Sequence, residues 1–75
     1  MIYPAKFNSI EEIEKLNDVV CELGLPIKVS AGADVVDARS LLALFTILNK
    51  EVNLVAPDHM PVEKFEMALK LIGIK

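Results

Sequence analysis

Two serines in this sequence stand directly ahead of helical patterns, where a hydroxyl can bond a free backbone amide. Ser40 follows Arg39 and precedes the apolar run 41–48. Serine is a preferred helix N-cap because its side-chain oxygen accepts a hydrogen bond from an amide of the first turn. Ser9 opens the sequence Ser-Ile-Glu-Glu, in which Glu12 can reach back to the backbone, so this stretch is a capping box. We therefore predict that both serines cap helices.

The other reactive side chains do not form a catalytic set. His59, the only histidine, lies in a proline-flanked loop without a second metal ligand nearby, so we interpret it as a solvated turn residue. Cys21, the only cysteine, falls within a helical pattern, where we expect a buried and inert thiol. The sequence contains no nucleophile–base pair, metal cluster or phosphate-binding glycine loop. We therefore predict that the protein is not an enzyme and has no cofactor or metal.

The composition is that of one small domain covering residues 1–75. This length lies near the lower limit for a core without disulfides or metals, and a hydrophobic content of 53% allows that core to be dense. The net charge of −3 and the lack of a basic cluster argue against nucleic acid as a ligand. The first residues lack the features of a signal peptide, and no apolar run approaches the roughly 20 residues that span a bilayer. We expect a cytoplasmic protein without a membrane partner.

The hydrophobic patterns predict seven elements in the order β-α-β-β-α-β-α. The strands are expected at 2–7, 27–31, 35–37 and 51–56, and the helices at 9–23, 40–48 and 61–72. Pro4 places the first strand at an edge of the sheet, because proline cannot donate a ladder hydrogen bond. Alternation gives each strand one apolar face, which needs helices on that side only. The predicted fold is an α+β open-faced sandwich, a four-stranded sheet of antiparallel type with three helices on one face.

The core should form between the apolar faces of these elements. The first and second strands, joined across a helix, should run parallel with another strand between them. The strand residues expected to face the helices are Ile27, Val29, Val52 and Leu54. The helix residues expected to face the sheet are Ile13, Leu16, Val20 and Leu23 in the first helix and Val62, Phe65, Ala68, Leu69 and Ile72 in the last.

Residues 27–48, IKVSAGADVVDARSLLALFTIL, resemble the middle of HPr, the small phosphocarrier of bacterial sugar phosphotransferase systems. In HPr a strand, a glycine-containing turn and a short second strand precede an Ala-Lys-Ser triplet that opens a short apolar helix. Here the triplet is Ala38-Arg39-Ser40. The resemblance covers most of the chain, is specific only in this segment, and departs from the family in a shorter link from Leu48 to Val52. It implies an HPr-like fold with the strand order 1-4-2-3.

The resemblance fails where HPr carries its phosphoryl group. HPr has Gly-Leu-His-Thr-Arg-Pro at the start of its first helix, whereas this chain has Phe-Asn-Ser-Ile-Glu-Glu, with Ser9 at the histidine position and Glu11 at the arginine position. A serine without a base is a weak nucleophile, and a carboxylate repels an incoming phosphate. The chain is similar in this respect to the catabolite-repression HPr-like proteins, which also lack the histidine and keep the serine of the triplet. The resemblance therefore implies an HPr-like protein without histidine-linked phosphoryl transfer.

The retained serine suggests regulation. In HPr proteins of many Gram-positive bacteria the serine of the triplet is phosphorylated by a dedicated kinase, which makes the protein a signal for catabolite control. The resemblance thus implies that Ser40 is a regulatory phosphorylation site, with Arg39 as the matching basic residue. A phosphate at a helix N-terminus faces free amides and the positive end of the helix dipole. A cap without a regulatory role is the alternative.

The run 41–48 is apolar on almost every side, although its helix can bury only one side in an open-faced sandwich. We expect Leu41, Leu44 and Leu48 to point inward. In HPr this helix lies in the surface used by protein partners, and an exposed apolar patch usually marks an interface. Extra core filling beneath the last helix is the alternative. The candidate docking residues are Arg39, Leu42, Ala43 and Phe45.

Together these features favour a non-catalytic regulatory or protein-binding module. The expected partner is a protein: a phosphotransferase-system component, a serine kinase or a transcriptional regulator. Two alternatives stay open. One is a genuine phosphocarrier with a displaced acceptor, either His59 or a histidine of a partner, and the other is a structural module that forms a homodimer through its apolar helix.

Overall fold

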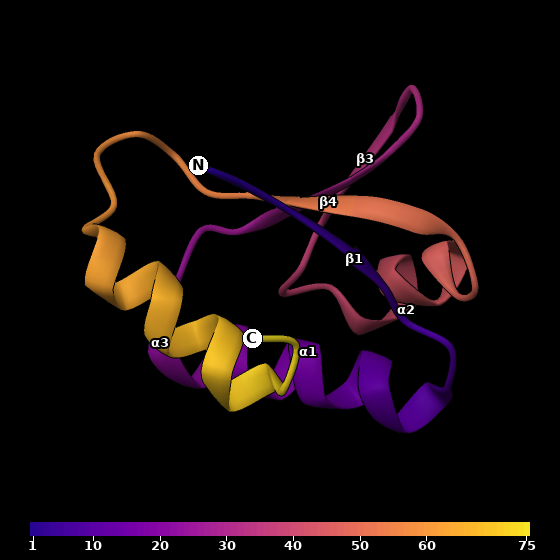
Figure 1. The fold of residues 1–75 in the computed structure, drawn as a ribbon. Helices are drawn as coiled ribbons and strands as arrows, with labels where there is room; N and C mark the ends of the chain where they lie inside the picture. Colours follow the sequence, from indigo (N-terminus) through magenta and orange to yellow (C-terminus); the bar gives the residue numbers. More distant parts are fainter.

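The computed structural model describes all residues 1–75 and contains the predicted elements in the predicted order (Figure 1). The strands are β1 (Ile2–Lys6), β2 (Lys28–Ala31), β3 (Asp34–Asp37) and β4 (Glu51–Val55). The helices are α1 (Ile10–Leu23), α2 (Leu41–Leu44) and α3 (Val62–Ile72), and a 3₁₀ turn, η1 (Phe45–Ile47), follows α2. No helix has the length and apolar character required to cross a membrane.

The four strands form one antiparallel sheet in the order β1-β4-β2-β3. Because β1 and β2 each pair antiparallel with β4, they run parallel to one another with β4 between them, as predicted. β1 occupies an edge, in agreement with Pro4. The helices lie on one side of the sheet (Figure 1), which confirms the α+β class and the open-faced arrangement.

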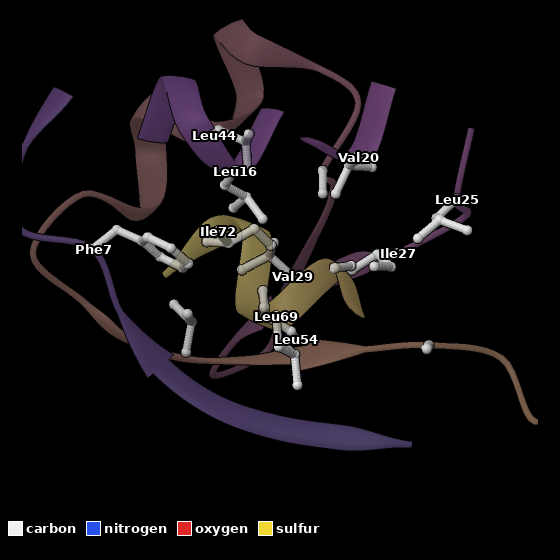
Figure 2. Close-up of a cluster of buried hydrophobic side chains, with 14 of the residues drawn as sticks. Phe7, Leu16, Val20, Leu25, Ile27, Val29, Leu44, Leu54, Leu69 and Ile72 are labelled. Atoms are coloured by element: carbon white, nitrogen blue, oxygen red, sulfur yellow. The ribbon is translucent and has the colours of Figure 1, made fainter. Parts of the chain in front are cut away.

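The core fills the space between the sheet and the helices. Figure 2 shows Leu16 of α1 and Leu69 and Ile72 of α3 directed toward Val29 and Leu54 of the sheet. Leu54 lies in the central strand β4, opposite Tyr3 of β1 and Val29 of β2. All the strand residues predicted to face the helices, and most of the helix residues predicted to face the sheet, are buried: Ile27, Val29, Val52, Leu54, Ile13, Leu16, Val20, Phe65, Ala68, Leu69 and Ile72.

Two predicted core residues, Leu23 and Val62, are exposed instead. Leu23 is the last residue of α1 and Val62 the first of α3. Both therefore lie at helix ends, where the chain leaves or enters the packed layer. The apolar pattern of the sequence continues to the end of each helix, but the side chains at these ends do not pack against the sheet.

The capping box at the start of α1 is confirmed with one change. The Ser9 hydroxyl accepts a hydrogen bond of 3.2 Å from the Glu12 amide, as predicted. The Glu12 carboxylate, however, accepts from the amide of Asn8 at 3.5 Å instead of from that of Ser9. At the other end Gly24 adopts a left-handed conformation with φ of 64°, which closes the helix before β2.

The helix expected over 40–48 is shorter than predicted. Only Leu41–Leu44 is α-helical, and Phe45–Ile47 tightens into 3₁₀ geometry. Asn49 then adopts a positive φ of 65°, and its amide donates to the carbonyl oxygen of Phe7 at 2.8 Å. The short connection to β4 reverses the chain at this point, so no further helical turn can form.

Candidate functional site

The predicted site residues meet in the loop between β3 and α2 and on the outer side of α2. Ala38 is buried, whereas the two following residues, Arg39 and Ser40, are exposed. On α2 and η1, Leu42 is 81% exposed and Phe45 is 38% exposed. This exposure shows that Leu42 does not fill the core, so the alternative of extra core filling beneath the last helix is wrong for this residue.

The inner side of this segment differs from the prediction by one position. Leu44 is fully buried, but Leu41 and Leu48 are only half-buried, and the second buried residue is Ile47. A 3₁₀ turn has three residues per turn, which places Ile47 directly beneath Leu44. Of the four docking candidates, Ala43 is half-buried, so Arg39, Leu42 and Phe45 offer most of the exposed surface; we call these three residues the docking surface.

Two side chains of α1 hold the loop in place. The side-chain amide of Asn17 donates to the carbonyl oxygen of Ala38 at 3.1 Å, and the thiol of Cys21 donates to that of Arg39 at 3.6 Å. Cys21 is therefore not the buried thiol that its helical pattern predicts; it is exposed and lies on the side of α1 next to the site loop. The error arises because Cys21 follows buried Val20, and one residue of helix rotation turns it away from the sheet.

A carboxylate with two basic partners stands beside Ser40. The Asp37 carboxylate accepts two hydrogen bonds from the Arg39 guanidinium, from Nε at 3.2 Å and from Nη2 at 2.9 Å, and one from the Arg39 amide at 2.9 Å. Lys28 Nζ, from the residue opposite on β2, lies 3.2 Å from Asp37 Oδ2. The hydrogen bonds from Arg39, with a smaller contribution from Lys28, hold the pKa of Asp37 well below its ordinary value.

Sequence reasoning missed Asp37 and Lys28. The predicted turn at 32–34 does not place Lys28 opposite Asp37, whereas the observed two-residue turn at 32–33 does. Asp37 in turn raises the pKa of Arg39 above its ordinary value, mainly through the side-chain hydrogen bond. Arg39 is thus a cation paired with Asp37 at the edge of the docking surface.

Ser40 occupies the N-cap position of α2, but its side chain makes no capping hydrogen bond. This corrects the prediction from sequence. Its backbone is anchored at both sides, since its amide donates to the Asp37 carbonyl oxygen and its carbonyl oxygen accepts from the Leu44 amide, each at 3.0 Å. The α-helical part has only four residues, so few amides need a cap. The Ser40 hydroxyl is therefore exposed and not committed to a structural bond.

The positions matching the HPr acceptor hold no comparable reactive group. The Ser9 hydroxyl is engaged in the cap of α1, 3.4 Å from Glu12 Oε1. His59 lies in the loop between β4 and α3, where it lines a shallow groove with Leu23 and Gly24 at the far end of α1. Since α1 has 14 residues, about 21 Å of helix separates this groove from Ser9. His59 therefore cannot stand in for a side chain at the Ser9 position.

No cluster of His, Cys, Asp and Glu side chains has the arrangement required to hold a metal ion. Comparison of the chain with protein-family models, with curated proteins and with solved structures found no match.

Proposed function

We propose that this chain is an HPr-like protein-binding module that docks through Arg39, Leu42 and Phe45 and does not carry phosphate on a histidine. The observation that carries the proposal is the 81% exposure of Leu42 on a segment whose inner residues, Leu44 and Ile47, are buried in the core. The strand order β1-β4-β2-β3 and the helices on one face agree with the HPr fold that residues 27–48 suggest.

The segment that carries the docking surface is held in place by core packing and by hydrogen bonds. Leu44 and Ile47 anchor the segment from below, and the hydrogen bonds from Asn17 and Cys21 fix the loop before it. A preorganised surface loses little conformational entropy on binding. An aromatic ring and an arginine beside an exposed leucine form a small apolar anchor with a charged edge, a composition that suits a protein contact.

The size of this surface favours a heteromeric contact over a homodimer. A stable interface buries about 800 Å² on each partner. Two apolar side chains and one arginine fall far short of that area, so they suit an anchor that enters a pocket of a larger partner. We expect the protein to sediment as a monomer, and a stable dimer that Leu42→Glu dissociates would favour the structural-module alternative.

Ser40 is the proposed regulatory site beside this surface. Its hydroxyl is exposed and makes no capping bond, so transfer of a phosphoryl group to it breaks no structural interaction. The added charge of about −1.5 to −2 would lie between Arg39 and Leu42, where it would alter which partners can dock. The proposed partner is a phosphotransferase-system component, the serine kinase itself or a transcriptional regulator.

The two phosphorylation chemistries can be separated in one experiment. The protein is incubated either with ATP and the serine kinase of an HPr system or with phosphoenolpyruvate and enzyme I, and the products are mapped by mass spectrometry. We expect acid-stable phosphate on Ser40 in the first reaction, none in its Ser40→Ala variant, and no phosphate in the second reaction. Acid-labile phosphate on His59 would support the phosphocarrier alternative instead.

The kinase reaction also tests the docking surface. Leu42→Glu should lower kcat/KM for Ser40 phosphorylation at least tenfold, because the substituted side chain repels an apolar pocket. Val62→Glu is the matched control, since Val62 is also an exposed apolar residue, at 57%, but lies at the start of α3. Equal kinetics for the two variants would show that Leu42 does not take part in docking.

A further inference from the structure

The guanidinium of Arg39 is bound by Asp37, although Arg39 is the residue next to Ser40. The two side chains share a forked pair of hydrogen bonds, Nε to Oδ1 at 3.2 Å and Nη2 to Oδ2 at 2.9 Å. The same carboxylate also contacts Lys28 Nζ at 3.2 Å. The cation nearest to Ser40 in sequence is thus already occupied by an acidic side chain, whereas the Ser40 hydroxyl makes no capping bond.

We propose that Asp37 is an internal competitor for Arg39, and that a phosphate on Ser40 takes the guanidinium from it. This inference rests on the proposed phosphorylation of Ser40. In that reaction a bond forms between Ser40 Oγ and the γ-phosphorus of ATP, and the bond from that phosphorus to the bridging oxygen breaks. ADP leaves, and the hydroxyl proton passes to the kinase base or to water. The product is a phosphoserine directly beside Arg39.

Charge and geometry both favour the transfer of Arg39. The phosphate carries about −1.5 to −2 near neutral pH against −1 for the carboxylate, and it offers three acceptor oxygens to the same fork of donors. The existing pair is accessible to water, with the Arg39 side chain 47% exposed and that of Asp37 30% exposed. An ion pair screened in this way resists exchange only weakly.

Asp37 does not become an unpaired charge when Arg39 leaves. Its carboxylate keeps Lys28 Nζ and also the backbone amide of Arg39, which donates at 2.9 Å. The backbone bond from the Ser40 amide to the Asp37 carbonyl oxygen does not involve either side chain. None of these contacts has to break when the Arg39 guanidinium leaves, so the loop can keep its shape.

The exchange changes the character of the docking surface. Before phosphorylation, Lys28, Asp37 and Arg39 together carry a formal excess of one positive charge. Phosphorylation makes this local sum negative and turns the guanidinium toward Ser40, next to Leu42. Arg39 is therefore bound to Asp37 while Ser40 is unmodified and to the phosphate after Ser40 is phosphorylated.

The test uses protein with phosphoserine built in at position 40 by chemical synthesis, so that it does not depend on recognition by a kinase. The Arg39 Nε–H signal is followed by NMR through a pH titration, together with the ³¹P signal. In unmodified protein we expect this Nε–H signal to follow the titration of Asp37 in acid. In the phosphoserine protein we expect the Nε–H signal to follow the second ionisation of the phosphate, which has a pKa of about 6. Arg39→Gln should raise that phosphate pKa.

Asp37→Asn tests the competitor itself. With a carboxylate present, Arg39 returns to Asp37 as the phosphate gains a proton; in Asp37→Asn there is no carboxylate to return to. We therefore expect a smaller change of the Nε–H signal across the phosphate titration in this variant, whereas Asp34→Asn on the same strand should leave it unchanged. An Arg39 signal that ignores the phosphate, or an equal change with and without the Asp37 carboxylate, would overturn the inference. Failure of a kinase to phosphorylate Ser40 would instead count against the proposed function alone.

Discussion

The side-chain amide of Asn17 donates a 3.1 Å hydrogen bond to the carbonyl oxygen of Ala38, which joins the middle of α1 to the loop that carries Arg39 and Ser40. One helical turn later, Cys21 bonds the next carbonyl oxygen, that of Arg39. α1 thus satisfies two successive carbonyl groups of the site loop from a single face. The position of the docking surface depends on α1 as much as on α2.

Asn17→Ala should therefore lower the free energy of unfolding by about 1–2 kcal/mol, because the carbonyl of buried Ala38 loses its donor. Amide hydrogen exchange in residues 38–44 should also become faster, since the loop is no longer tied to α1. Asp18→Ala is the control, because Asp18 is the adjacent exposed residue of the same helix. Urea unfolding and exchange followed by NMR check both effects; equal behaviour of the two variants would show that this hydrogen bond does not hold the loop.

Much of this fold can be predicted because its elements have clean periodicity. Val52 and Leu54 alternate with exposed neighbours, so the buried face of β4 is fixed before its partners are known. Gly24 ends α1 where a left-handed residue is required. The strand order came from the resemblance of residues 27–48 to HPr, and pattern alone supplied only the parallel relation of β1 and β2.

The site was harder to predict because it depends on contacts between distant residues. Asp37 meets Lys28 only through strand register, and Cys21 meets Arg39 only after α1 packs beside the loop. Helix propensity could not show that the segment after Ser40 tightens to a 3₁₀ turn, since the short return to β4 imposes that geometry. Local sequence therefore indicated the exposed residues of the proposed docking surface but not the side chains that position them.

The two N-cap serines should respond differently to removal of the hydroxyl. Ser9→Ala should lower the free energy of unfolding by about 1 kcal/mol, because the Ser9 hydroxyl accepts a hydrogen bond from the Glu12 amide. Ser40→Ala should change it by less than about 0.5 kcal/mol, since the Ser40 side chain makes no capping bond. Chemical denaturation of the two variants under the same conditions provides the comparison. A larger loss for Ser40→Ala would mean that its hydroxyl caps α2 in solution.

The Asp37 cluster should make stability depend on pH in acid. The pKa of Asp37 is lower in the folded protein than its ordinary value of 3.8, so the carboxylate is stabilised by folding. This contribution is fully present above the ordinary pKa and is lost as the pH falls through the lower folded value. The loss should be modest, because both basic partners are half-exposed to water.

Urea unfolding of the wild type and of Asp37→Asn measures this dependence. The wild type should be the more stable of the two at about pH 7, and the difference should shrink as the pH is lowered below about 4, where Asp37 of the unfolded chain begins to gain a proton while the folded protein keeps it charged. Asp34→Asn, on the same strand but without a basic partner, should show no such convergence. A difference that stays constant from neutral to acidic pH would show that Asp37 does not bind its basic partners in solution.

The contrast between Leu54 and Leu42 tests the division between core and docking surface. Leu54 is fully buried in the central strand, so Leu54→Ala should lower the free energy of unfolding by about 2–5 kcal/mol through the cavity that it leaves. Leu42, at 81% exposure, loses few contacts on truncation, and Leu42→Ala should change stability by less than about 0.5 kcal/mol. The same Leu42→Ala variant should nevertheless weaken Ser40 phosphorylation by the kinase, because binding and not folding uses this side chain. If Leu42→Ala unfolds the protein as readily as Leu54→Ala does, then Leu42 belongs to the core and the proposed docking surface loses its anchor.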